Sequence, residues 1–336
     1  MVTEQIKESL QDILVPGVMR SLPKLNLVRQ IAISDCKVDI SLAAAGLDSG
    51  TQDWLKSKVS EAVGPLAGTS QVNVNFVPAA PKEVNEVGSV IAVMSGKGGV
   101  GKSLVAALLS IALVRDGKEV GLLDADITGP SIPKIFGLSG TRPRGSESGI
   151  LPVLSKLGIS IMSINLLLEH EDDAVIWRGP IISRVIQQFW EDVLWGKLDY
   201  LIVDLPPGTA DAPLTVLQTI PSSGIVIVFS PQELAAMVVK KAVRMAHQMK
   251  IPILGVVENM SYFVPPGSKK KLELFGKSRS QEMSEAAGAP LLAQIPINPE
   301  LAKLCDEGKI ERYNSKIFDS LSRNFIHALS VKAKQT

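Results

Sequence analysis

A glycine-rich octapeptide at residues 96–103 holds the most specific chemistry in this sequence. It reads GKGGVGKS and fits the pattern G-x-x-x-x-G-K-[ST], which binds phosphate when it follows a strand and opens a helix. Residues 89–94 have the apolar character of a buried strand, and residues 102–114 that of a helix. The glycines let backbone N–H groups turn toward phosphate oxygens beside the positive helix end. The expected phosphate contacts are Gly96, Gly98, Gly99, Val100 and Gly101.

Three polar side chains of the octapeptide add charge and metal chemistry. Lys102 is expected to act in catalysis by neutralising the β and γ phosphates, and Ser103 to offer its hydroxyl to Mg²⁺. A second lysine, Lys97, directly follows the first glycine, and most loops of this type lack it. The loop sequence alone leaves open whether Lys97 is a solvated lysine or a functional one.

Carboxylates that follow two predicted strands are expected to complete the site. Residues 120–123 lead into Asp124-Ala125-Asp126, and residues 200–203 lead into Asp204. Ligands collect at the carboxyl ends of strands in parallel sheets, so these acids should lie beside the loop. We assign Asp126 to the attacking water, Asp124 to Mg²⁺ through water, and Asp204 to the Mg²⁺ shell. The alternatives are solvated loop acids for the first pair and a helix-capping role for Asp204.

The segment LPPGTADAP after Asp204 has the composition of a switch. Gly208 is expected to be free to move its N–H toward the γ phosphate. Asp211 belongs either to the same switch or to the solvated surface.

Adenine is the favoured base. Residues 253–258 form a late predicted strand, and the sequence after it reads Asn259-Met260-Ser261-Tyr262, without the lysine and aspartate of the guanine-specific N-K-x-D pattern. Asn259 is expected to hydrogen-bond the adenine edge, and residues 295–300 to pack on its face.

The order of predicted elements places these residues in an α/β domain. Apolar strands alternate with helices, which predicts a mostly parallel sheet flanked by helices on both faces. Its strands are expected at residues 89–94, 119–123, 159–165, 200–203, 224–229, 253–258 and 291–295. We expect this P-loop NTPase domain to span residues 88–336.

A small α+β domain is expected at residues 1–77, followed by a Pro-containing and charged linker at 78–87. Its helices are predicted from Ile6, Leu10, Ile13 and Leu14 and over residues 53–63, where Trp54, Leu55 and Val59 should point inward. Its strands are predicted at residues 25–33, 37–42 and 72–77.

The composition of the chain limits the classes of partner that it is expected to bind. The chain is 46% hydrophobic and 21% charged, with a net charge of +1, which gives no electrostatic case for nucleic-acid binding. Its apolar runs are too short to span a bilayer, and the first residues do not resemble a secretory signal. We therefore expect a cytoplasmic protein without a membrane partner. Two cysteines, Cys36 and Cys305, exclude a disulfide scaffold and a CxxC pair.

Several longer motifs include residues beyond the candidate site. They are GKGGVGKS, DADITGPSIP, WRGP (residues 177–180), DYLIVDLPPGTAD, SPQELA (230–235), ENMSYF (258–263) and FGKS with AQIPINPEL. Over residues 88–312 the chain resembles the Mrp-type, or ApbC-like, iron-sulfur cluster carrier ATPases. Residues 1–77 resemble the MIP18-type (DUF59) domain that is often fused ahead of this ATPase, with a weaker match.

The resemblance implies an activity and partners. It implies ATP hydrolysis with Mg²⁺ by an ATP-sandwich homodimer that holds an iron-sulfur cluster between its subunits and delivers it to apoproteins or receives it from an assembly partner. The loop also resembles the deviant Walker A motif of the MinD and ParA groups. There the additional lysine reaches the nucleotide of the partner subunit, which implies that role for Lys97.

The chain departs from the family where the cluster ligands are expected. The family usually continues after ENMSYF with V-C-P-x-C, whereas this chain has Val264-Pro265-Pro266-Gly267-Ser268. Pro265 and Ser268 therefore occupy the two cysteine positions, and neither supplies a thiolate. We expect Cys36 and Cys305 to be small core or surface residues. The following residues 269–271 are three lysines, read as a solvated hairpin tip or as a docking patch for an acidic partner.

Two other functions remain open at this point. One is a MinD- or ParA-like positioning ATPase, with Ile317, Leu321, Phe325 and Leu329 on a membrane-binding helix rather than on one that closes the domain. The other is a nucleotide-gated adaptor without a cluster, in which the amino-terminal domain grips a partner.

Overall fold

The computed structural model describes residues 2–34, 37–67, 71–127, 129, 131–168, 179–232 and 235–333. The chain forms two compact units. The first contains residues 1–88, 142–154 and 188–199, and the second contains residues 89–141, 155–187 and 200–336. Cys36 and the first two residues of WRGP lie outside the described residues.

The first unit is an α+β structure with a three-stranded sheet. Strand β2 lies between β1, its antiparallel neighbour, and β3, its parallel neighbour. Helices α1 and α2 pack on each other, and apolar side chains such as Ile6, Leu10 and Ile40 form the core. The elements are α1 (Val2–Gln11), β1 (Val28–Ser34), β2 (Lys37–Ala43), α2 (Ser49–Ala67), β3 (Val72–Val77), α3 (Pro81–Val84), β6 (Arg144–Ser146), β7 (Gly149–Leu151) and β8 (Val153–Leu154).

Two side chains in this unit differ from the expectation. Leu55 and Val59 of α2 are buried, but Trp54 is 40% exposed. Residues 55 and 59 share one helix face because they are four positions apart, whereas residue 54 lies about 100° away from residue 55. Leu14 is also exposed, because α1 ends at Gln11 and Leu14 lies in the following loop. The predicted linker contains α3 and the first residues of β4, and the boundaries of the domains stay a prediction.

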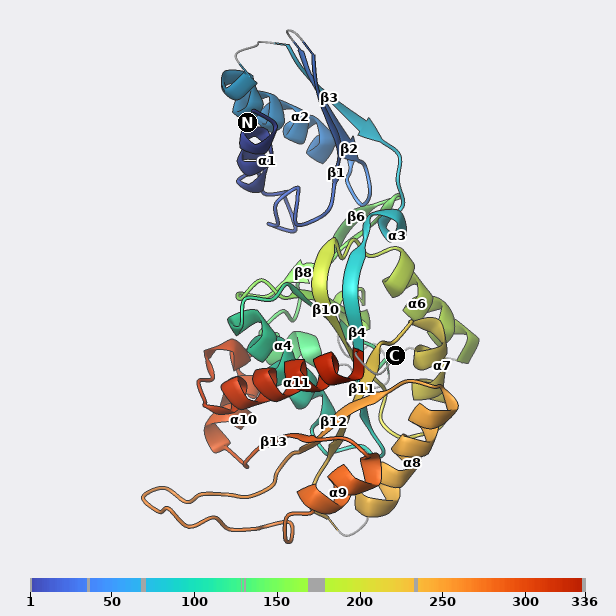
Figure 1. Cartoon of the computed structure of the whole chain (residues 1–336), viewed down its shortest axis with the longest axis vertical. Helices are drawn as coiled ribbons and strands as arrows, with labels where there is room; N and C mark the ends of the chain where they lie inside the picture. The colour runs from blue at the N-terminus through green and yellow to red at the C-terminus, as the bar shows by residue number, and fades with distance from the viewer. Residues whose placement is uncertain are drawn as a thin grey trace. The chain divides into compact units, whose positions relative to one another are not determined.

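The second unit is built on a mostly parallel sheet, as predicted. Its strands lie in the order β13-β12-β11-β4-β10-β5-β9, and the pairs β12/β13, β11/β12, β11/β4, β10/β5 and β5/β9 are parallel. The strands β11 and β12 are buried at every residue, because helices cover both faces. Helices α4 and α11 lie on one side of the sheet, and α7 and α8 lie on the other (Figure 1).

The elements wholly or mostly in this unit have the following bounds. The strands are β4 (Glu86–Ser95), β5 (Val120–Asp124), β9 (Ser160–Ser163), β10 (Lys197–Asp204), β11 (Gly224–Phe229), β12 (Ile253–Glu258) and β13 (Leu291–Gln294). The helices are α4 (Lys102–Arg115), α5 (Ile132–Phe136), α6 (Gly179–Glu191), α7 (Asp211–Thr219), α8 (Ala235–Gln248), α9 (Ser280–Ala287), α10 (Pro299–Asp306) and α11 (Ile317–Ala333), with 3₁₀ turns η1 (Ile164–Leu166) and η2 (Ile310–Arg312).

Helix α11 closes the sheet rather than offering an apolar face. It packs against α4, β12 and β13. Leu321 and Phe325 are fully buried, and the Phe325 ring meets the Tyr200 ring edge-on with 5.6 Å between centroids. The membrane-binding interpretation of this helix is therefore wrong for these two side chains. Among the described residues, no helix is long and apolar enough to cross a membrane.

We predict that Phe325→Ala destabilises the second unit. Removing a fully buried ring leaves a cavity that typically costs about 3–5 kcal/mol of unfolding free energy. Urea denaturation followed by circular dichroism measures this loss. Val331→Ala on the same helix is the matched control, because Val331 is 39% exposed and should cost less than about 0.5 kcal/mol. Equal stability of the two variants would show that α11 does not close the core.

Candidate functional site

The predicted site residues meet at the carboxyl ends of three neighbouring strands. The octapeptide follows β4, Asp204 ends β10 and Asp124 ends β5, and these strands are adjacent in the order β4-β10-β5. Asp204 and Asp124 are direct partners in the parallel register of β10 and β5. Parallel pairing therefore brings two carboxylates that are far apart in the sequence to one edge of the sheet.

The loop requires glycine where its backbone is left-handed. Gly99 and Gly101 both have φ of +80°, a conformation that other residues rarely adopt. A Cβ atom at Gly101 would also clash with Nδ2 of the buried Asn259 side chain. Gly101 directly precedes α4, whose first residue is Lys102. The backbone N–H groups at the start of α4 are thereby placed for an anion.

Lys102 is a buried cation surrounded by the predicted metal and catalytic groups. Its side chain is 6% exposed, and Nζ lies 2.6 Å from Oδ1 of Asp204. The same Nζ lies 4.0 Å from Oδ2 of Asp126 and 3.5 Å from Oγ of Ser103. The structure therefore brings Asp204, Asp126 and Ser103 together around the Lys102 ammonium group.

The carboxylates outnumber the cation at this point. Burial, with the nearby Asp204 carboxylate, raises the pKa of Asp124 to about 8, although the Lys102 ammonium acts in the opposite direction. Burial also raises the pKa of Asp204, which Lys102 opposes. Among the described residues, no donor reaches the buried Oδ2 of Asp204. An unsatisfied buried carboxylate oxygen within excess negative charge fits a divalent cation.

Mg²⁺ fits this donor set, because it prefers oxygen ligands and retains water and phosphate ligands. The hydroxyl of Ser103 and the free oxygen of Asp204 are the side-chain groups that would hold it. In the described part of the chain, no group of three or more His, Cys, Asp and Glu side chains is arranged to hold a metal ion alone. The protein would therefore share the ion with the phosphates.

Asp124 fixes the loop that carries Asp126. Its Oδ2 accepts hydrogen bonds from the backbone N–H groups of Ser131 and Ile132 and from Oγ of Ser163, at 3.1–3.2 Å. Its Oδ1 accepts one from the N–H of Asp126 at 3.2 Å. Both oxygens are thus engaged within the protein, and the predicted action of Asp124 on Mg²⁺ through water stays a prediction.

Asn259 supports the phosphate loop from β12. Its buried side chain donates a hydrogen bond from Nδ2 to the carbonyl of Val100 at 2.8 Å. The predicted contact with adenine stays a prediction, and it would fall to Oδ1, because Nδ2 already binds the loop. An amide that bridges the loop and a base is consistent with both roles.

The two predicted switch residues are placed differently. The N–H of Gly208 donates to the carbonyl of Ser95 at 3.0 Å, so it must leave Ser95 to reach a phosphate. Asp211 is exposed and begins α7. The sequence identified Gly208 but not its present acceptor.

Lys97 has partners that the sequence analysis missed. Its Nζ donates to Oε1 of Gln232, and its carbonyl accepts from Oγ of Ser95 at 2.9 Å. Gln232 follows β11, the neighbour of β4, within the SPQELA motif. The sequence signal that could have identified Gln232 is its place as a polar residue shortly after the carboxyl end of a strand.

The loop after β12 forms a hairpin where the family's cysteines are expected. Phe263 and Leu272 exchange backbone hydrogen bonds of 2.8 Å across it. The N–H of Ser268 donates to the carbonyl of Pro265 at 3.0 Å, so the two positions close one turn. Among the lysines that follow, Lys271 lies over the Tyr262 ring, at 4.1 Å. The lysines are exposed, as expected of a hairpin tip.

A buried carboxylate joins the two ends of this segment. Glu258 accepts hydrogen bonds from Ser261 at 2.6 Å, from Ser278 and the N–H of Arg279 at 2.7 Å, and from Gln294 at 2.9 Å. Four donors satisfy the charge without a cation. The base of the hairpin is therefore fixed by hydrogen bonds rather than by thiolate ligands.

Cys305 lies on α10 and is half-buried. Burial, with the adjacent Asp306 carboxylate, raises the pKa of its thiol to about 11. Iron binds the thiolate form, so ligation by Cys305 requires a deprotonation that burial makes more costly.

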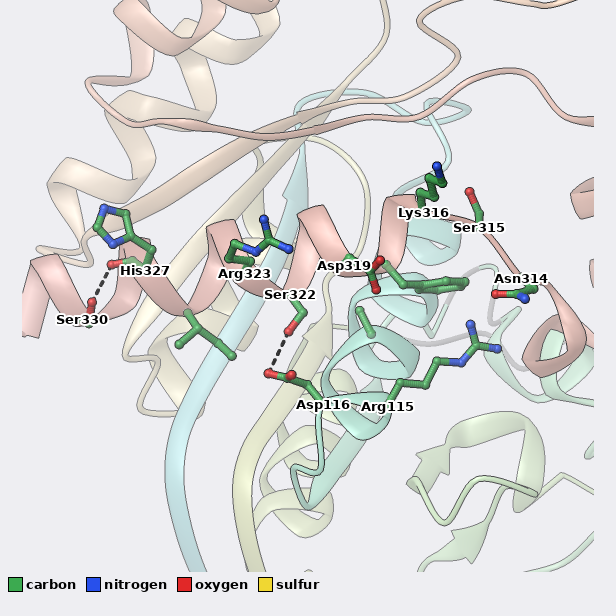
Figure 2. A pocket seen from close by; sticks show the side chains of 13 residues that line it. Arg115, Asp116, Asn314, Ser315, Lys316, Asp319, Ser322, Arg323, His327 and Ser330 are labelled. Carbon is green, nitrogen blue, oxygen red and sulfur yellow. Dashed lines mark hydrogen bonds between the residues drawn. The ribbon is translucent and has the colours of Figure 1, made fainter.

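A separate cavity of about 710 Å³ lies between the carboxyl end of α4 and α11 (Figure 2). Asp116 on its wall accepts a hydrogen bond from Ser322 at 3.1 Å. Arg115 stacks on the Phe318 ring at 4.3 Å and donates to the carbonyl of Tyr313. These contacts hold the end of α4 against α11 and the residues before it. We therefore interpret the cavity as part of the packing between these helices.

Comparison with known proteins agrees with the nucleotide chemistry of this site. A family model described as the NUBPL iron-transfer P-loop NTPase, of the ParA group, matches residues 86–329. An iron-sulfur cluster carrier protein of Aquifex aeolicus is 39% identical over 333 residues, covering 90% of this chain and 88% of that protein. One from Clostridium perfringens is 47% identical over 232 residues, covering 67% of this chain and 81% of that protein.

Solved structures give the same result for the fold. A nucleotide-binding protein of Archaeoglobus fulgidus in complex with ADP is 47% identical, with a TM-score of 0.63, over 69% of this chain and 91% of that chain. The septum site-determining protein MinD of Pyrococcus horikoshii, complexed with Mg-ADP, is 20% identical, with a TM-score of 0.50, and covers 74% of this chain and 97% of that chain. The second likeness supports the fold alone.

The resemblance inferred from the motifs is thereby confirmed for the P-loop NTPase part of the chain, while the likeness of residues 1–77 to MIP18-type domains stays a prediction. The family model covers well over half of the chain, and the Aquifex relative matches nearly its full length. This chain therefore belongs to the NUBPL family of iron-transfer P-loop NTPases.

Proposed function

We propose that this protein binds and hydrolyses ATP with Mg²⁺ as a homodimer, and that this cycle serves the delivery of iron-sulfur clusters to apoproteins. The buried pairing of Lys102 with Asp204 beside the phosphate loop is the observation that carries the proposal. The names of the Aquifex and Clostridium relatives support the cluster as cargo.

Each residue of the site has a defined part in hydrolysis. The loop N–H groups and Lys102 bind the β and γ phosphates, and Asp126 orients a water molecule toward the γ phosphorus. The water oxygen forms the new bond to phosphorus while the bond to the bridging oxygen breaks. The water proton passes to the released phosphate, and ADP leaves with the electron pair of the broken bond. Lys97 of the second subunit stabilises the charge that develops on ADP. Mg²⁺ would neutralise the phosphates when held by Ser103 and Asp204.

The cluster is a substrate whose ligands differ from the family pattern. Pro265 and Ser268 close a turn where the cysteines are expected, and Cys305 is held in its thiol form. We infer that thiolate ligands come from the donor or recipient protein rather than from this hairpin.

A nucleotide-gated adaptor without a cluster is the second candidate. The same turn at Pro265 and Ser268 favours it, because neither residue supplies a thiolate where the family's cluster ligands are expected. In that function, ATP binding and hydrolysis would change only the affinity for a partner protein.

We predict that Lys97→Ala still binds ATP but loses hydrolysis. The Lys97 side chain donates to Gln232, whereas Asp204 and Asp126 lie beside Lys102. Binding within one subunit should therefore be retained, whereas turnover should fall by at least about 100-fold, as for other charge-stabilising groups. Fluorescent-nucleotide titration measures binding, and phosphate release measures turnover.

The matched variants separate the two lysines of the loop. Lys102→Ala should lose nucleotide binding, and exposed Lys134→Ala should change neither quantity. Circular dichroism of each variant checks the fold. A Lys97→Ala protein that hydrolyses ATP like the wild type would disprove the proposed role of this lysine.

We also predict that the isolated protein does not retain a stoichiometric cluster. The described residues offer the hairpin turn and one protonated thiol, Cys305, in place of four thiolates. Anaerobic reconstitution with iron and sulfide, followed by EDTA and metal analysis, measures the cluster content. A stoichiometric cluster that survives EDTA would contradict the view that ligands come from another protein.

A further inference from the structure

We propose that Gln232 is a positioning residue that holds Lys97 within its own subunit until ATP and a second subunit draw the lysine away. This inference rests on the proposed function, in which Lys97 acts across the dimer. Lys97 is half-buried in the described chain, and its Nζ donates to Oε1 of Gln232. A lysine that acts on another subunit must leave this contact first.

The sheet places the partner of Lys97 at a fixed position. The strands β11, β4 and β10 are neighbours, and the residues that follow them are Gln232, the phosphate loop and Gly208. Parallel strands end at one edge, so residues on these three segments meet. The order of the strands therefore brings Gln232 and Lys97 close together.

Ser95 ties the backbone of Lys97 to the switch. Oγ of Ser95 donates to the carbonyl of Lys97 at 2.9 Å, and the carbonyl of Ser95 accepts the N–H of Gly208 at 3.0 Å. Lys97 is thus held twice, through its side chain by Gln232 and through its backbone by Ser95. The Gly208 N–H that is expected to meet the γ phosphate is held by the same residue.

The chemistry of the holding group makes the contact reversible. An amide oxygen binds an ammonium group but leaves its charge unneutralised. A phosphate anion binds the same ammonium group more strongly, so nucleotide can displace Gln232. A carboxylate at position 232 would instead form an ion pair that competes with phosphate.

Two substitutions therefore have opposite effects. Gln232→Leu removes the acceptor at similar volume and should free Lys97, whereas Gln232→Glu should hold it more tightly. A residue with a merely structural role would be impaired by both substitutions. Gln281, an exposed glutamine on α9, provides matched controls as Gln281→Leu and Gln281→Glu.

The first measurement tests the contact without nucleotide or turnover. Acetylation of Lys97 by a succinimidyl ester, followed by peptide mass spectrometry, reports the access of the amine, with exposed Lys269 as the internal reference. We expect labelling to be several-fold faster in Gln232→Leu and slower in Gln232→Glu, in accord with the loss or strengthening of one bond to a charged group. Equal labelling rates in wild type and both variants would overturn the proposal.

The second measurement tests the consequence for the dimer. Sedimentation with a slowly hydrolysed ATP analogue gives the midpoint protein concentration for dimerisation. We expect the midpoint to fall about tenfold in Gln232→Leu and to rise about tenfold in Gln232→Glu, in accord with one hydrogen bond to a charged group. Shifts in the same direction would overturn the role of Gln232. A wild-type protein that never dimerises with ATP would contradict the proposed function itself, whereas equal labelling with normal dimerisation contradicts only the role of Gln232.

Discussion

The buried ion pair between Lys102 and Asp204 is the interaction on which the site depends. Two fully buried carboxylates, Asp124 and Asp204, lie near a single buried ammonium group, and Asp126 adds a third acid at their edge. Such a cluster is costly to bury, and breaking one partner of a buried pair typically costs about 3–5 kcal/mol. The cluster lies at the carboxyl edge of the sheet, where phosphate and a divalent cation would balance its negative charge.

The parallel sheet explains why these groups converge. Each strand ends at the same edge, so the loops after β4, β5, β10, β11 and β12 all contribute to one site. Asn259 reaches the phosphate loop from β12, and Gln232 reaches it from β11. Helix α11 contributes by covering the sheet, because Phe325 fills its core from a position far along the chain. The candidate site therefore lies at the carboxyl ends of the strands, whereas α11 packs against the sheet.

The sequence predicted the parts of this arrangement that depend on local patterns. Strands 72–77, 224–229 and 253–258 agree residue for residue with the structure, because the first alternates apolar and polar residues and the other two are short, largely apolar runs. Trp54 was placed inward by its apolar character alone, but helix geometry puts it at the edge of the buried face. The contacts of Lys97 with Gln232 and of Glu258 with Gln294 can be anticipated only once the strand order is known, because each joins residues on or just after neighbouring strands. Strand order is a property of the folded sheet and not of any segment.

The cation predicted beside Asp204 provides the most direct test of the central claim. The measurement is the affinity for ATP with Mg²⁺ and with EDTA, in wild type and in Asp204→Asn, by competition with a fluorescent nucleotide. The free oxygen of Asp204 is the buried acceptor that the ion would satisfy. We predict that Mg²⁺ strengthens binding at least about tenfold in wild type and has no effect in a folded Asp204→Asn protein. An equal effect of Mg²⁺ in both proteins would contradict the account.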